Sequence, residues 1–237
     1  MIDNSDPAGL GRVKVAFYWA GGNRKSDWMH LIQPHAGAGK GFYFIPEIDE
    51  EVLVGFEGGS AEKPYVMGTN YNGSESSGYG SSGNDIKVIQ TRSGCKILIN
   101  DADGSILTED KAGSKVFQDG KGNITGDAPE TITFNCKNMV VNASESIITT
   151  AGMNISESAG VDKSTTVGAI LNTSVGGDSM MNVVGDMFEL VKGNKETEGK
   201  EIKEMAKEVT LNSIEGNINV KGAKNVNNHS GEKSKNA

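Results

Sequence analysis

Few of the side chains that perform catalysis occur in this sequence, and their spacing fits no familiar catalytic arrangement. A hydrolytic triad needs a histidine beside a nucleophile and an orienting carboxylate. The three histidines, His30, His35 and His229, are accompanied by neither a G-x-S-x-G elbow nor a cysteine-centred signature. We therefore expect no catalytic residue and predict that the protein is not an enzyme.

Two loops match cofactor motifs only in part. Residues 37–40 (Gly-Ala-Gly-Lys) start like a phosphate-binding loop, but the pattern G-x-x-x-x-G-K-[ST] would need glycine at Pro34 and a hydroxyl residue at Gly41. Residues 101–104 (Asp-Ala-Asp-Gly) start like a calcium loop, but the EF-hand pattern fails at the next two positions. We predict a turn between strands at residues 101–104 and expect no cofactor.

The metal-binding side chains are equally sparse. Cys95 and Cys136 are far apart and lack C-x-x-C spacing, which favours free thiols in a reducing compartment over a disulfide or a zinc site. Three copies of His229 would offer three nitrogen ligands, but a lone histidine in a polar tail is usually solvated. We expect no metal.

Composition narrows the fold class and the partners. Glycine occurs 32 times while aromatic residues make up only 6%, a mixture typical of short strands joined by tight turns. The formal charge of −8 repels phosphate backbones and lipid headgroups, so no nucleic-acid partner is expected. No apolar run approaches the roughly 20 residues that span a bilayer, and we expect synthesis as a soluble cytosolic protein.

The first third of the chain predicts a small barrel. Alternating apolar and polar residues, separated by glycine-rich turns, indicate five short strands. They are expected near residues 13–19, 28–33, 42–45, 51–56 and 64–69. Five such strands fit an OB-type barrel. Its core is predicted to contain Val13, Val15, Trp28, Phe42, Val54 and Phe56.

The second half contains a repeat of eight residues. Four valines fall eight residues apart, and each is followed two positions later by alanine or glycine. The valines are Val167, Val175, Val183 and Val191. A unit of this length holds one short strand and a bend, so it cannot enclose a core by itself. We predict three chains wound together, with these valines as the trimer seam.

The barrel residues resemble those of the valine-glycine repeat protein G family (VgrG), the spikes of type VI secretion and related contractile injection systems. The resemblance runs in order over about the first 73 residues and continues into the segment that follows. It rests on residues 11–15 (Gly-Arg-Val-Lys-Val), Trp28, residues 33–34 (Gln-Pro), 41–46 (Gly-Phe-Tyr-Phe-Ile-Pro), 51–59 (Glu-Val-Leu-Val-Gly-Phe-Glu-Gly-Gly), Pro64, Gly68 and 71–73 (Tyr-Asn-Gly).

The resemblance implies a homotrimer with an OB-type barrel and a triple-stranded β-helical needle. It also implies a PAAR-type tip protein at the C-terminal needle end, hub, baseplate and tube proteins on the N-terminal side, and secreted effectors as cargo. The spike would touch a target membrane only transiently, after assembly in the cytoplasm and translocation. VgrG proteins usually carry a large hub domain before the barrel, so the chain is expected to be a C-terminal fragment or to come from a system with separate hub and spike chains.

These inferences divide the chain into four parts. Residues 1–73 are predicted to form the barrel, 74–130 a connecting segment and the start of the needle, 131–224 the needle, and 225–237 a polar tail. Residues 195–208 are strongly charged and fit either an interrupted helix or a polar part of the needle, and we favour the needle. Lys195 is expected to be solvated surface.

Three alternatives remain open at this stage. A contractile phage tail spike would obey the same physics in a virion. A β-helical adhesin would be expected to carry a secretion signal and exposed aromatic grooves, and an enzyme such as a polysaccharide lyase would act on glycans. We predict a membrane-puncturing spike.

Overall fold

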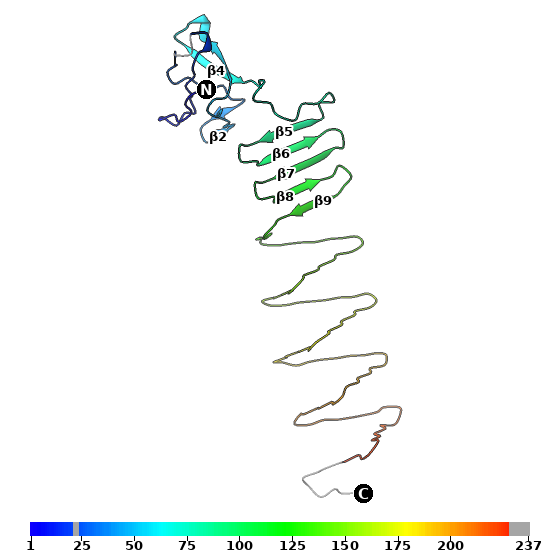
Figure 1. Cartoon of the computed structure of the whole chain (residues 1–237). Helices are drawn as coiled ribbons and strands as arrows, with labels where there is room; N and C mark the ends of the chain where they lie inside the picture. Colours follow the sequence, from blue (N-terminus) through cyan, green and yellow to red (C-terminus); the bar gives the residue numbers. More distant parts are fainter. Residues whose placement is uncertain (21–23, 228–237) are drawn as a thin grey trace. The chain divides into compact units, whose positions relative to one another are not determined.

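The computed structural model describes residues 1–20 and 24–227, and within these ranges the regular structure is β, with no α-helix. Two short 3-10 turns, η1 (Tyr18–Ala20) and η2 (Glu57–Gly59), are also present. The chain divides into two units, Met1–Ile147 and Ile148–Ala237. Figure 1 shows paired strands in the first unit and an open, winding chain in the second. No helix among the described residues is long and apolar enough to cross a bilayer.

The N-terminal part of the first unit is only partly built from regular strands. Strand β3 (Val52–Phe56) pairs with β4 (Pro64–Thr69) in an antiparallel hairpin with an irregularity between Leu53 and Val54. These two strands confirm the fourth and fifth predicted runs. A small hairpin joins β1 (Ala36–Gly37) to β2 (Lys40–Gly41).

The other three predicted strands are not regular strands. Residues 13–19 and 28–33 meet through single bridges, such as Val13 with Met29, and a parallel bridge joins Leu31 to Val66. The first run ends early because its last residues enter η1. Residues 42–45 form no strand, since the hairpin β1–β2 directly before them closes over residues 36–41. Isolated bridges still bring the apolar faces together.

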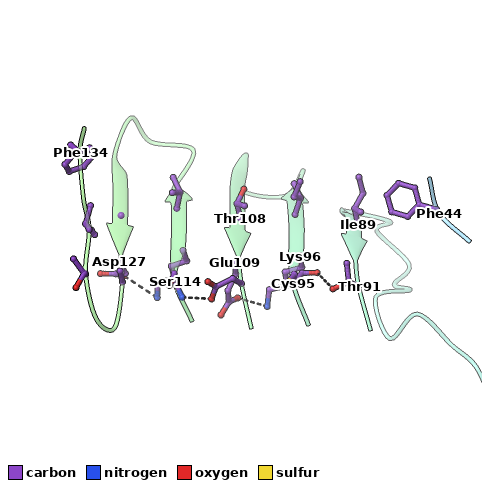
Figure 2. Close-up of a pocket in the computed structure, with 18 residues that line it drawn as sticks. Phe44, Ile89, Thr91, Cys95, Lys96, Thr108, Glu109, Ser114, Asp127 and Phe134 are labelled. Atoms are coloured by element: carbon purple, nitrogen blue, oxygen red, sulfur yellow. Dashed lines mark hydrogen bonds and ion pairs between the residues drawn. The ribbon is translucent and has the colours of Figure 1, made fainter. Parts of the chain in front are cut away.

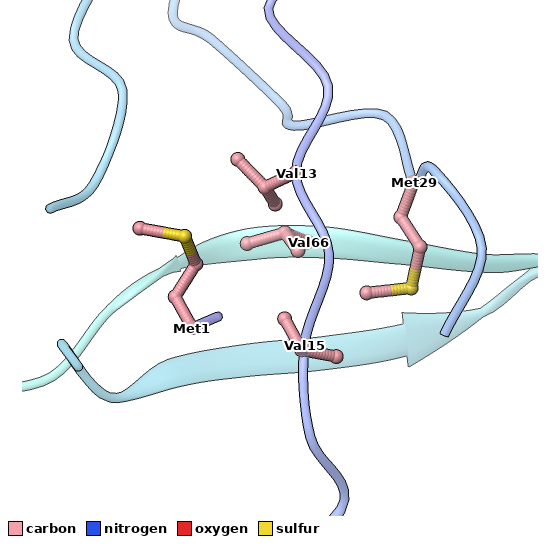
Figure 3. Close-up of a cluster of buried hydrophobic side chains, with 5 residues drawn as sticks. All are labelled: Met1, Val13, Val15, Met29 and Val66. Atoms are coloured by element: carbon pink, nitrogen blue, oxygen red, sulfur yellow. The ribbon is translucent and has the colours of Figure 1, made fainter. Parts of the chain in front are cut away.

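The core is a cluster of five buried side chains (Figure 3), namely Met1, Val13, Val15, Met29 and Val66. Val13 and Val15 confirm two of the predicted core residues, and Val54 packs against the cluster. Trp28 and Phe56 are half-buried. Fully burying a valine stabilises a fold by about 1.5–3 kcal/mol, so this small cluster holds the segment together. The ammonium group of Met1 also donates to the carbonyl oxygen of Glu50 at 2.6 Å.

The prediction that Phe42 belongs to the core is wrong for this chain, because its side chain is 50% exposed. The backbone N–H of Phe42 donates to the carbonyl oxygen of His35 at 2.9 Å, which ties the residue to the hairpin. Its ring lies 6.4 Å from that of Phe44, centroid to centroid. Gly41 has φ 123°, and a Cβ there would lie 2.4 Å from the His35 oxygen, so the tight turn requires glycine.

A buried ion pair fixes the first loop. The side chain of Asp6 is only 2% exposed and lies 2.8 Å from the Arg12 guanidinium. The same carboxylate accepts backbone N–H bonds from Ala8, Leu10 and Arg12. The Arg12 side chain, followed by these backbone donors, holds the pKa of Asp6 well below its usual range, although partial desolvation opposes the shift. The charged form of Asp6 therefore stabilises the loop.

The second part of the first unit is an antiparallel meander of five strands in sequence order. The strands are β5 (Ile86–Gln90), β6 (Lys96–Asn100), β7 (Ser105–Glu109), β8 (Lys115–Gln118) and β9 (Ile124–Asp127). Residues 101–104 form the turn between β6 and β7, which confirms the prediction made for this loop. The meander is the most regular structure in the chain.

Aspartates close the later hairpins of the meander. One carboxylate oxygen of Asp110 accepts the N–H groups of Ala112 and Ser114, and Asp119 binds the N–H groups of Lys121 and Asn123 in the same way. The pKa of Asp110 is lowered chiefly by the Ser114 N–H, and that of Asp119 by the Asn123 side chain. The sharp turns are therefore specified locally by the sequence.

From residue 129 to residue 227 every described residue is exposed and none belongs to a strand. Residues 195–208 form no helix, which contradicts the alternative of an interrupted helix, and their place in a needle stays a prediction. The predicted boundaries at 73, 130 and 224 stay predictions, and most of the predicted tail, including His229, lies outside the described residues.

We predict that Asp6→Asn lowers the melting temperature of the first unit at pH 7. The pKa of Asp6 is depressed in the folded protein, so its contribution is complete above the unfolded carboxyl pKa of about 4 and is lost as the pH falls towards the folded value. The difference between wild type and variant should therefore narrow below about pH 4. Thermal unfolding followed by circular dichroism between pH 2 and pH 7 measures it.

Asp27→Asn is the matched control, because Asp27 is exposed and its carboxylate makes no hydrogen bond within the described part of the chain. An Asp6→Asn protein as stable as this control at pH 7 would contradict the role given to the ion pair.

Candidate functional site: the assembly face

The described residues contain no group of three or more His, Cys, Asp or Glu side chains placed to hold a metal ion. His30 and His35 are exposed. Cys95 and Cys136 are free thiols, and a hydrogen bond with the Ser93 hydroxyl is the main cause that lowers the pKa of Cys95. Among the described residues these groups do not converge on one place, and the features that recur along the chain are surfaces.

The eight-residue repeat is visible in the backbone. Bends recur at residues 152–153, 160–161, 168–169, 176–177, 184–185 and 192–193, with six extended residues between one bend and the next. Each predicted seam valine is the last residue before a bend. Their side chains are 45–50% exposed, whereas Val184, which lies in a bend, is 99% exposed. The four valines Val167, Val175, Val183 and Val191 therefore share one geometric position.

The backbone of this region has no partner within the chain. Among the described residues beyond Asp127, no backbone N–H donates to a backbone carbonyl. Figure 1 shows the chain passing back and forth without pairing between passes. Extended backbone groups are satisfied either by water or by neighbouring strands. A regular repeat with a row of apolar side chains favours pairing with neighbouring strands, because a chain bound only to water would leave that apolar row exposed to solvent.

The meander has an unusual distribution of apolar residues, since both of its faces carry them. On one face, Ile89, Ile97, Thr108, Val116 and Gly126 lie opposite one another across all five strands. On the other, Val88 is aligned with Leu98, Leu107 and Phe117. Antiparallel sheets usually keep one polar face in water. A sheet that is apolar on both faces calls for cover on both.

The first of these faces lines a cavity of about 710 Å³ (Figure 2). Phe44 and Phe134 flank it at its two ends, and Ile89, Ile97 and Val116 contribute its apolar floor. Ile89, Ile97 and Val116 are each about half exposed. Apolar side chains left open on this scale mark a contact surface.

Ion pairs lie at the strand ends beside this cavity, on the face of Leu98 and Leu107. Lys96 Nζ lies 2.8 Å from Glu109 Oε2, and Lys115 Nζ lies 3.4 Å from Asp127 Oδ2. Both pairs join residues that face each other on adjacent strands, and the hydrogen bond to Glu109 raises the pKa of Lys96. Such cross-strand pairs reinforce the register of the sheet.

Sequence reasoning missed this meander as a surface. It described residues 74–130 as a connecting segment and the start of the needle. Two signals could have revealed several of these strands, namely the short apolar runs within 86–90, 96–100 and 105–109 and the Asp-Gly turns at 103–104 and 119–120. The turn aspartates are what make the hairpins so regular.

Comparison with known proteins defines the class of the N-terminal part. Residues 1–71 match the family described as "Type VI secretion system/phage-baseplate injector OB domain". The bridged N-terminal strands are thus similar to the OB domain of contractile injectors. The predicted resemblance to the VgrG family is confirmed over this part of the chain.

Three relatives illustrate the match. The "Type VI secretion system spike protein VgrG1c" of Pseudomonas aeruginosa is 34% identical over 90 residues, which is 36% of this chain and 12% of that protein. The "Actin cross-linking toxin VgrG1" of Vibrio cholerae is 37% identical over 73 residues, 29% of this chain and 7% of that protein. The "Type VI secretion system spike protein VgrG3" of Vibrio cholerae is 35% identical over 74 residues, 30% of this chain and 7% of that protein. The match spans about an eighth or less of the length of these relatives.

Proposed function

We propose that the protein is the trimeric, membrane-puncturing spike of a bacterial contractile injection apparatus of the type VI secretion kind. The observation that carries the proposal is the repeat beyond residue 150, whose backbone is unpaired and whose valines recur at one geometric position. The OB domain and its VgrG relatives support the same reading. The proposed trimer is an intertwined β-helix.

Three copies suit the geometry of the repeat. Six extended residues span about 20 Å, which is the length of one ordinary strand and one side of a small shaft. Three chains would provide three walls, pair the free N–H and C=O groups and bury the valine row together. The two-sided meander would be covered by the same partners. The valine row and both faces of the meander would then be covered by neighbouring chains.

The function follows from stiffness. A closed shaft of paired strands has no open edge, so it transmits a push along its axis without unravelling. In this proposal the spike assembles in the cytoplasm, is driven by contraction into a target cell, and performs no catalysis itself. A contractile phage tail spike is the second candidate, favoured by the phage-baseplate part of the family description.

The partners are proposed from the same architecture. Hub, baseplate and tube proteins would join the N-terminal side, and a PAAR-type tip protein would cover the open C-terminal end of the shaft. Effectors would travel as cargo on this complex. An uncovered end would leave three unpaired strand edges, and a cap gains hydrogen bonds and apolar burial by covering them.

The first test is solution mass. We expect the purified full chain to be a trimer of three 25.0 kDa subunits in multi-angle light scattering. A stable monomer at micromolar concentration would reject the proposal, because it would leave the repeat without partners.

The second test concerns the seam. We predict that Val175→Asp reduces the trimer fraction strongly, because three carboxylates would be buried in one layer at a cost of several kcal/mol per trimer. Ser174→Asp is the matched control, since it adds the same charge one position earlier, where the side chain of an extended segment points the opposite way. Equal trimer content in the two variants would show that the seam has been assigned to the wrong residues.

The third test concerns the tip. Truncation after Gly193 should abolish capture of a cognate PAAR-type protein in a pull-down while circular dichroism shows that the N-terminal strands remain folded. Retained binding would place the partner elsewhere on the chain. A truncation after residue 224, which removes only the predicted tail, serves as the control and should still bind.

A further inference from the structure

The extended stretches between the bends have two distinct sides. Between residues 154 and 199 each stretch contains six residues. We call the second, fourth and sixth residues of each stretch the seam set and the first, third and fifth the outer set. Because side chains alternate along extended backbone, each set shares one side. The four seam valines are all sixth residues, so they belong to the seam set.

Exposure separates the two sets in the single chain. Large apolar residues of the seam set are 45–74% exposed, whereas those of the outer set are 71–94% exposed. The seam set is thus, on the whole, the less exposed side of the winding chain. Among the methionines, Met181 and Met187 of the seam set are less exposed than Met180 of the outer set, whereas Leu171 and Leu190, one from each set, are equally exposed.

Charged residues are distributed unevenly between the sets. The outer set carries only acidic charges, at Asp162, Asp178, Asp186, Glu196 and Glu198. The seam set carries four charges, and they form two pairs. Lys163 Nζ contacts Glu157 Oε2, and Lys195 Nζ lies 2.6 Å from Glu189 Oε2. Each pair joins the fourth residue of one stretch to the second residue of the next, across a bend.

We propose that these two ion pairs form charged layers inside the assembled trimer, where three copies of each pair meet, and that they set the register of the three chains. The inference rests on the proposed trimeric needle. It replaces the expectation that Lys195 is solvated surface, because Lys195 shares the side of Val191 and is bound to Glu189.

A valine seam cannot set the register by itself. The valines repeat every eight residues, so a chain that slips by one stretch still places valine against valine. The two ion pairs lie 32 residues apart, which is four stretches. A slip of two or three stretches sets both pairs against uncharged residues of the neighbouring chains, and a slip of one stretch in one direction sets Lys195 against the like charge of Lys203. Each pair keeps its partner within its own chain in a slipped assembly, but it then lies in an otherwise apolar layer, where its attraction offsets its desolvation only in part. Slipped assemblies are therefore disfavoured.

Paired charges are the arrangement that an interior tolerates. Breaking a buried pair on one side is strongly destabilising, while replacing both partners by apolar residues is often neutral or stabilising. In known coiled coils a single buried polar residue fixes register at some expense of stability. The two pairs act here in the same manner.

The first experiment compares full-length trimers by thermal unfolding. We expect Lys195→Met to lower the midpoint by roughly 10 °C or more, because three Glu189 side chains lose their partners. The double variant Glu189→Met/Lys195→Met should recover most of that loss. The matched control is Lys192→Met, at a bend and without an ion pair among the described residues, and its midpoint should stay within about 2 °C of wild type.

The second experiment measures register. Asn182→Cys, on the outer side, is spin-labelled in a Cys95→Ser/Cys136→Ser background, and distances between labels are measured by double electron–electron resonance. We expect one distance for the wild-type charges. Replacement of Glu157, Lys163, Glu189 and Lys195 by Met should retain trimers but add longer distances from slipped chains.

Two outcomes would overturn the proposal while leaving the trimeric needle intact. These are a Lys195→Met midpoint equal to that of Lys192→Met, and a single unchanged distance in the fourfold variant. A wild-type chain that is monomeric by mass would instead reject the proposed function, so the two failures are distinguishable.

Discussion

The free backbone groups beyond residue 129 are the constraint on which the rest of the structure depends. About a hundred residues extend without one backbone-to-backbone hydrogen bond in the part of this region that the structure describes. Ordering a residue costs about 1–2 kcal/mol of conformational entropy, and a region without internal bonds cannot offset it. In the proposed trimer the repeat is ordered by other strands, and its periodic features serve that pairing. Assembly and folding of this region are then one process.

The first unit meets the opposite condition, since its turns are specified by local interactions. Asp110 and Asp119 bind the N–H groups two and four residues onward, so each hairpin closes by itself. The meander between the OB domain and the repeat can thus form before partners arrive. Its two apolar faces then offer a prepared surface on which neighbouring chains can align. Along the sequence, the part that folds through its own contacts therefore comes before the part that is proposed to fold with other chains.

The sequence predicted most accurately what depends on periodicity. Spacing of four valines predicted the eight-residue unit, and the bends recur at that spacing. Val13 and Val15 were predicted as core because period-2 alternation identifies a buried face in any β-fold. The assignment of Phe42 to the core was wrong because alternation alone does not reveal that a tight hairpin turns the following residue outward. Met1 and Met29 were missed because flexible methionines fill gaps that only the packed neighbours define.

Repetition and register are competing requirements in such a sequence. Identical units give every layer the same packing, which suits a stiff shaft, but they also make neighbouring registers nearly equal in energy. Irregular residues remove that degeneracy only where they face the other chains. The exposed acidic residues of the outer set cannot do so, whereas Glu157–Lys163 and Glu189–Lys195 lie on the side of the valines. The repeat therefore specifies the packing of each layer, and the charged residues that interrupt it on the seam side are proposed to specify the register.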